Sequence, residues 1–177
     1  MQKPQVKGEL FIKTHSFIMK KWGTERAKKI GLDPGFYRPE AWYPLEEFCA
    51  VFSSIAQVMG GDPVTYAFLI GHTTMLSDVR FAFLFKDKDP KEVFNTSRNQ
   101  SKVQQTGDFK GSSESSNSLS VYTNIWTQDD NIANIWSEFY RGRSQGVLDL
   151  TGRKGKVEKV MDLSGSEKAV TYEIRWF

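Results

Sequence analysis

The sequence predicts an α+β (α/β) fold in which an N-terminal helical layer packs on an antiparallel sheet. Two observations predict it. Apolar residues recur at spacings of three and four through the first half of the chain, as they do on the buried face of a helix. In the second half, two hairpin-like pairs of alternating segments flank one long amphipathic stretch, so we expect a single sheet built from two hairpins with a long helix between them.

Four helices are expected in the first half, each with its own boundary signals. Gly23 and Gly31 are residues of the kind that end a helix. Pro44 stands where the first turn of a helix favours proline, and Asp62 followed by Pro63 is a typical helix start. The expected helices span 8–22, 24–30, 44–59 and 63–75.

The segment 77–87 leaves its secondary structure open. Apolar side chains alternate through 79–85 as they would in a strand, but the continuous run 82–84 breaks the alternation and also suits a helix. Beyond this segment, the pair Asp89–Pro90 starts a polar helix that we expect to continue towards Gln105.

The first hairpin is expected from two short strands, 106–110 and 119–125. Between them lies 111–118, which is rich in Gly, Ser and Asn and is typical of a loop. The long helix follows, and its apolar side chains are Ile125, Trp126, Ile132, Ile135, Trp136, Phe139, Tyr140 and Val147. Gly152 and Gly155 bracket the next turn, and the closing strands are expected at 156–163 and 168–177.

Composition and charge limit the kind of protein. A chain of 177 residues suits one domain, 1–177, with 1–7 as a flexible lead-in. The net charge is only +3, from 24 basic and 21 acidic residues, which gives no reason to expect nucleic acid as a partner. No apolar run reaches the roughly 20 residues that span a bilayer, and no signal core is visible, so we expect a cytoplasmic protein without a membrane span.

Several short motifs resemble a known group of proteins. They are Val6-Lys7-Gly8, Ala41-Trp42-Tyr43-Pro44, Ile70-Gly71-His72, the pair Gly142 and Gly146, and the terminal Tyr172-Glu173-Ile174-Arg175-Trp176. Together they resemble an uncharacterised bacterial family that is similar to the 4-vinyl reductase domain. That family is grouped with the haem-nitric-oxide/oxygen-binding (H-NOX) domains and the TRAPP vesicle-tethering subunits. The resemblance covers roughly residues 6–177.

The resemblance implies a ligand-binding fold with an apolar cavity between helices and sheet, in proteins that are often dimeric or fused to signalling partners. The sequence also departs from these relatives. The cysteines that 4-vinyl reductase domains carry near the C-terminal hairpin are missing, and so is the Tyr-x-Ser-x-Arg clamp that holds the haem propionates in H-NOX domains. The cofactor is therefore left unknown, with haem an alternative that the sequence does not favour.

Aromatic residues are the candidates for a ligand pocket. Thirteen Phe and five Trp can either fill a dense core or line an apolar cavity. His72, near the end of a predicted helix, could ligate haem iron or interact with the helix carbonyls. The candidate ligand-binding residues are Phe48, Phe52, Phe68, His72, Phe83, Trp136 and Phe139.

The sequence gives no sign of catalysis or of a metal site. It contains no nucleophile paired with a base and no oxyanion motif, so we expect no enzyme and no catalytic residue. Its two histidines are too far apart for a familiar metal-site spacing. The only cysteine, Cys49, lies among apolar residues beside Glu46 and Glu47, which disfavours a reactive thiol, although its modification stays an open question.

These observations lead to one functional hypothesis and two alternatives. The hypothesis is a non-catalytic sensory or binding domain that holds a small apolar ligand between helices and sheet and signals through protein contacts, as a homodimer or with a signalling partner. The alternatives are a dimerisation or scaffold module without a ligand, and a haem-based gas sensor that depends on His72.

Overall fold

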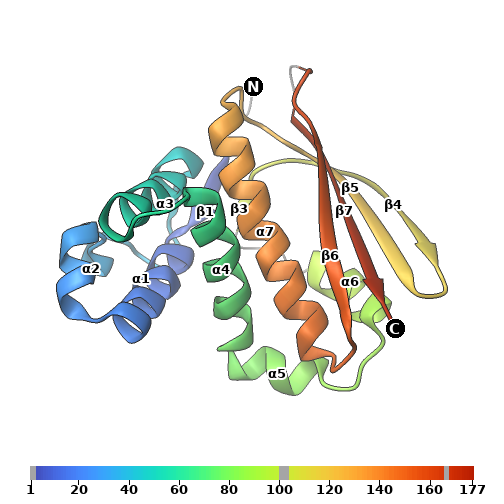
Figure 1. Ribbon diagram of the computed structural model, residues 1–177. Coiled ribbons are helices and arrows are strands. Elements are labelled where there is room, and N and C mark those ends of the chain that lie inside the picture. Colours follow the sequence, from blue (N-terminus) through green and yellow to red (C-terminus); the bar gives the residue numbers. More distant parts are fainter. Residues whose placement is uncertain (1–2, 100–103, 166–167) are drawn as a thin grey trace.

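The helices and the large sheet form separate layers (Figure 1). A computed structural model describes residues 3–99, 104–165 and 168–177. At one side lie α1 (Gly8–Trp22), α2 (Thr24–Ile30) and α3 (Leu45–Met59). Next to them α4 (Pro63–Leu76) packs along α7 (Asp130–Leu150), which in turn contacts the sheet. The predicted α+β architecture is confirmed.

The large sheet joins the two predicted hairpins. Its order is β4-β5-β7-β6, and each neighbouring pair is antiparallel. Tyr172 lies opposite Val121 on one side and Lys159 on the other, so the last strand is central and holds the hairpins together. The strands are β4 (Phe109–Ser115), β5 (Ser118–Ile125), β6 (Gly155–Asp162) and β7 (Lys168–Trp176).

The loop predicted at 111–118 was wrong, because the strands extend almost to the tip of the hairpin. Only Ser116 and Asn117 separate β4 from β5, and Ser115 Oγ lies 2.6 Å from Ser118 Oγ. β4 is an edge strand, and nearly all of its residues are exposed. An edge strand with no buried face needs few apolar side chains, so its polar sequence looks like a loop.

The start of the long helix was also misplaced. Ile125 is the last residue of β5, and α7 begins at Asp130. The Asp129 carboxylate accepts hydrogen bonds from the amides of Asn131 and Ile132, which fixes the first turn of the helix. The apolar residues before this cap therefore belong to the strand and to the connection.

A second, three-stranded sheet was missed in the sequence. Its order is β2-β1-β3, with β1 (Gln5–Lys7) in the centre between β2 (Trp42–Pro44) and β3 (Gln104–Gln105). The flexible lead-in expected at 1–7 is thus wrong for Gln5–Lys7, and Val6 has no exposed surface. Strands of two or three residues are too short to show any periodicity.

The open segment 77–87 is helical. α5 spans Val79–Phe85, and Asp78 caps it by accepting a hydrogen bond from the Arg80 amide. α6 spans Pro90–Asn99; of the extension predicted towards Gln105, Gln104 and Gln105 lie in β3, and 100–103 fall outside the described residues. A short 3₁₀ turn, η1 (Pro34–Phe36), lies between α2 and β2.

Glycines bring α4 and α7 into direct backbone contact. A Cβ atom added at Gly71 would lie 2.2 Å from the carbonyl oxygen of Phe139, and one added at Gly142 would lie 2.1 Å from that of Phe68. At Gly146 the added atom would meet the His72 carbonyl oxygen at 2.9 Å. Since no side chain fits between the backbones at these positions, the three glycines set how closely the two helices approach.

Substituting alanine for Gly71 or Gly142 should destabilise the fold. We expect Gly71→Ala to lower the free energy of unfolding by about 2 kcal/mol or more, although alanine favours helices by about 1 kcal/mol over glycine. Urea unfolding followed by circular dichroism measures this change. Gly35→Ala in η1 is the control, because its Cβ would meet only the Asp33 side chain at 3.2 Å. A Gly71→Ala protein as stable as the parent would contradict the contact.

Candidate functional site

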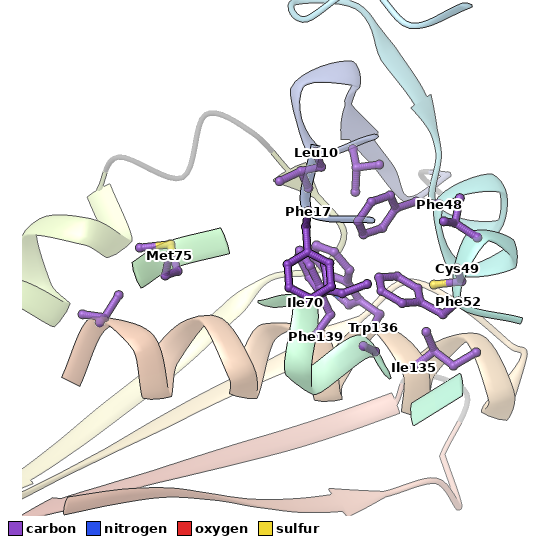
Figure 2. Packing of buried hydrophobic residues seen from close by; sticks show 14 of the residues in the cluster. Leu10, Phe17, Phe48, Cys49, Phe52, Ile70, Met75, Ile135, Trp136 and Phe139 are labelled. Carbon is purple, nitrogen blue, oxygen red and sulfur yellow. The ribbon is translucent and has the colours of Figure 1, made fainter. Parts of the chain in front are cut away.

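Four of the predicted pocket residues meet, but they fill the space between the helical layer and α7. Phe48, Phe52, Trp136 and Phe139 are each at most 3% exposed (Figure 2). The ring centre of Phe48 lies 5.2 Å from that of Phe52 and 5.1 Å from that of Phe139, with the rings nearly perpendicular. Such edge-to-face contacts are the packing of a closed core. These four residues contribute to stability at a place where we had expected a cavity.

Phe68 and His72 lie together on α4, away from this core. Their rings stack with centres 6.0 Å apart, and the Arg141 guanidinium lies 4.1 Å from the Phe68 ring centre. His72 Nε2 lies 2.7 Å from the Asp149 carboxylate, which also accepts a hydrogen bond from Gln145. This network joins α4 to α7 through side chains, beside the glycine contacts.

Phe83 is separate from the other predicted residues. It lies on α5 with 87% of its surface exposed, and Val79, one turn earlier, is 78% exposed. A phenylalanine in this position cannot line a buried pocket. Together with Val79 it forms an exposed apolar surface on α5.

A groove of about 480 Å³ lies between α1 and the α4–α5 corner. α1 contributes Lys13, Ser16, Phe17, Lys20 and Lys21. The facing side consists of Thr73, Thr74, Ser77, Asp78, Val79 and Arg80. None of the seven predicted ligand-binding residues lines this groove. It was missed because its walls come from separate helices whose relative placement no local pattern reveals.

The groove runs between two antiparallel helices. Lys13, in the first half of α1, lies 3.4 Å from Asp78 after the end of α4. The Trp22 ring at the end of α1 contacts the Tyr66 ring near the start of α4, with centres 5.7 Å apart. The Phe17 ring lies between these contacts and is almost buried.

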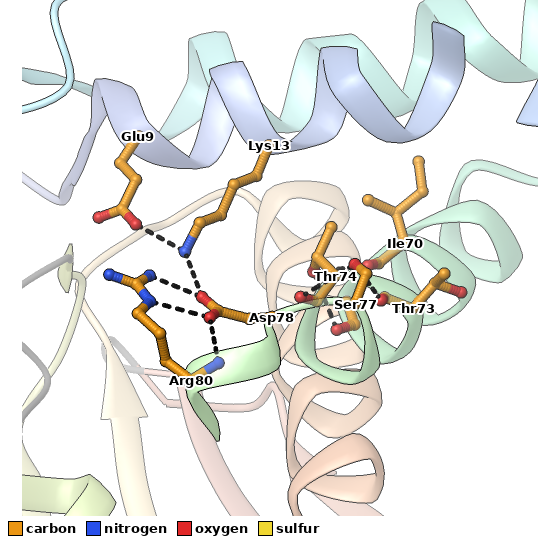
Figure 3. Close-up of polar contacts among 9 residues, drawn as sticks. Glu9, Lys13, Ile70, Thr73, Thr74, Ser77, Asp78 and Arg80 are labelled. Atoms are coloured by element: carbon orange, nitrogen blue, oxygen red, sulfur yellow. Dashed lines mark hydrogen bonds and ion pairs between the residues drawn. The ribbon is translucent and has the colours of Figure 1, made fainter. Parts of the chain in front are cut away.

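One end of the groove is closed by a network of four charges (Figure 3). Glu9 bonds Lys13 at 2.6 Å, Lys13 reaches Asp78, and Arg80 holds Asp78 through hydrogen bonds of 2.7 and 2.9 Å. The hydrogen bonds from Arg80, helped by the charge of Lys13, lower the pKa of the Asp78 carboxyl to about 2 despite its partial burial. Asp78 therefore stays ionised and connects α1 to α5.

The floor of the groove exposes little free hydrogen-bonding capacity. The Thr74 hydroxyl donates to the Ile70 carbonyl at 2.7 Å, and the Ser77 hydroxyl donates to the Thr73 carbonyl at 2.8 Å (Figure 3). Because these hydroxyls are satisfied within α4, the groove offers mainly methyl groups, the Phe17 ring and lysine stems to a ligand.

Two hollows beneath the sheet are small, at about 110 and 30 Å³. The hollow of about 110 Å³ lies between the sheet and α7, lined by Tyr172 of β7 and by Trp136 and Tyr140 of α7 among others. The Tyr172 hydroxyl donates to the Ser137 carbonyl, and burial raises its pKa well above the ordinary value. A neutral, hydrogen-bonded tyrosine closes this region and makes a poor ligand for a metal.

Cys49 is an inert core residue in this fold. It is 2% exposed on α3, and its thiol lies 3.8 Å from the Ile132 carbonyl. Burial, followed by the charges of Glu46 and Asp129, raises the pKa of the thiol far above its usual value. Over the ranges 3–99, 104–165 and 168–177, no cluster of His, Cys, Asp or Glu could hold a metal ion. In the same ranges no helix is long and apolar enough to cross a membrane.

Comparison with known proteins identifies the fold. The Fe(II) unliganded H-NOX protein from K. algicida superimposes with a TM-score of 0.66 and 14% identity, over 97% of this chain and 96% of that chain. A structure from a study of haem distortion in the H-NOX family gives a TM-score of 0.68 and 12% identity, over 96% of this chain and 94% of that chain. A Tt H-NOX variant gives a TM-score of 0.66 and 10% identity, also over 96% of this chain and 94% of that chain.

The chain therefore has an H-NOX-like fold along almost its whole length. No protein-family model and no curated protein matches the sequence, so the likeness concerns the fold alone. The further resemblance to 4-vinyl reductase domains and TRAPP subunits stays a prediction.

The acid stability of the protein should depend on Asp78. Its folded pKa of about 2 lies below the unfolded value of 3.8, so its stabilising effect is complete above about pH 4 and is lost as the pH falls towards 2. We expect Asp78→Asn, which can still cap α5, to reduce stability at pH 7 by about 1 kcal/mol and to flatten the decline between pH 4 and 2. Urea unfolding at a series of pH values measures both effects. Parallel curves for the two proteins would contradict the network.

The Cys49 thiol should be unreactive in the folded protein. We expect Ellman's reagent to modify it at least 100-fold more slowly than the same thiol in urea, because the buried thiol forms little thiolate. The absorbance of the released thionitrobenzoate gives both rates. Rapid labelling of the native protein would show that α3 opens or that the burial is wrong.

Proposed function

We propose that the chain is a non-catalytic sensory domain that binds a small apolar ligand and signals through protein contacts. The observation that carries the proposal is an open apolar groove on a chain whose fold matches H-NOX proteins over almost its full length. In the described parts of the chain no hydroxyl or thiol bonds either histidine, which supports a binding role over a catalytic one.

The position that we propose for the ligand differs from the position expected from the sequence. The space between the helical layer and α7 is occupied by the rings of Phe48, Phe52 and Phe139. The groove beside α1 has the volume of a small-molecule site, which is typically about 300–1,000 Å³. We therefore place the ligand on the outer side of α4, against α1 and α5.

Haem, the group named for one of the similar structures, does not fit the side chains that the structure describes. His72 Nε2 is held by Asp149, and the ring stacks on Phe68 rather than facing a hollow. His15 lines a different, open groove of about 350 Å³ between α1 and α2. The large groove contains no His, Cys, Met or Tyr that could ligate iron.

Protein contacts have a visible candidate surface on α5. Val79 and Phe83 share one exposed face of the helix, and Leu84 next to Phe83 is 54% exposed. Exposed apolar side chains that cluster in this way are typical of interaction sites. A homodimer or a complex with a signalling protein would cover them, and Val79 would connect that interface to the groove.

The proposal predicts a colourless protein that retains an apolar ligand. We expect native mass spectrometry of the purified protein to show an adduct that organic extraction removes. After supplementation with haem we expect no Soret band, and His72→Ala should leave the absorption spectrum unchanged. A clean apo mass with no binding to any apolar probe would contradict the sensory role, and a Soret band lost in His72→Ala would restore the gas-sensor alternative.

A further inference from the structure

Two lysines at the rim of the groove are not used by the fold. Lys20 and Lys21 lie on the last turn of α1 and are exposed, and among the residues that the structure describes neither ammonium forms an ion pair or a hydrogen bond. At the other end of the groove, Lys13 and Arg80 are occupied by Glu9 and Asp78. The groove thus has one compensated end and one end with two available positive charges.

The surface between these ends is apolar. Phe17 lies on the α1 wall one turn before Lys21 and faces the Thr74 side of α4. Val79 follows near the compensated end, and Phe83, one turn further along α5, continues the apolar surface outside the groove. A ligand that matches this arrangement has an anionic head and an extended aliphatic chain.

We propose that the groove binds a long-chain carboxylate, with its head group at Lys20 and Lys21 and its chain along Phe17 towards Val79. This inference rests on the proposed function and specifies the ligand class for that site. A free ammonium group at this end can pair with a carboxylate, and the network around Asp78 gives the far end no free charge that would attract a second head group.

The relative size of the two contributions favours a fatty carboxylate over a compact anion. A solvent-exposed ion pair is weak, so each lysine should change affinity by no more than about fivefold. Each methylene that leaves water can change affinity by up to about fourfold. The chain therefore determines most of the affinity, and the lysines select an anion over a cation.

Calorimetric titration with three probes tests the assignment. Dodecanoate should bind, octanoate should bind at least tenfold more weakly, and dodecyltrimethylammonium should bind more weakly than dodecanoate. In Lys20→Glu/Lys21→Glu the affinity for dodecanoate should fall about tenfold, and the preference for the carboxylate over the cation should disappear. Val79→Asp, at an exposed position, should weaken the binding of dodecanoate by a similar factor without loss of folding.

A matched variant separates the groove from general electrostatics. Lys29→Glu/Lys154→Glu makes the same change in net charge at two exposed positions outside the groove, and its affinity should equal that of the parent. Equal weakening in both double variants would overturn the head-group assignment. If neither Val79→Asp nor the Lys20–Lys21 change affects dodecanoate binding, the groove is rejected as the binding site, while the sensory role stays intact.

Three other results would also reject the proposed ligand class. If native mass spectrometry shows a bound apolar molecule but dodecanoate neither binds nor displaces it, the sensory role survives and the carboxylate does not. If an acidic amphipathic peptide binds at the groove and dodecanoate does not, the groove is a protein-docking site. A protein that binds no apolar molecule of any kind would remove this inference together with the proposed function.

Discussion

The backbone contact between α4 and α7 is the constraint on which the rest of the structure depends. Gly71 and Gly142 let the two helices meet without intervening side chains. α7 lies on the sheet, and α4 carries the connection to α3 and α1, so this contact fixes the position of the N-terminal helices relative to the strands (Figure 1). The aromatic core around Phe48 and Phe139 then fills the space between α3 and α7.

The same arrangement explains why the open space lies outside the core. Large rings close the region between α3 and α7, while α1 meets the end of α4 through Phe17 and a charge network. The resulting groove has satisfied hydroxyls on its floor and charges at its ends. A ligand bound there as proposed would contact α5, since Asp78 both caps that helix and joins it to α1.

Much of the fold was predictable, whereas the candidate site was not. The helices with glycine or proline boundaries and the pairing of two hairpins follow from local spacing and turn chemistry, as at Gly23 and Pro63. The buried strand at Val6 and the polar strand β4 show no usable period, because one is too short and the other has no buried face. Aromatic residues in one cluster look alike whether they line a cavity or fill it, and only the packing of Phe52 against Phe139 decides between these cases.

The central claim is that the ligand-binding space lies in the groove beside α1 and not beneath the sheet. Amide NMR spectra recorded during titration with dodecanoate test this claim most directly. The account predicts that the shifted amides lie in the last two turns of α1 and in the stretch Thr73–Arg80, with α3 and the centre of α7 unchanged. Shifts concentrated on the amides around Trp136, Tyr140 and Tyr172 would contradict it, because they would place the ligand between α7 and the strands.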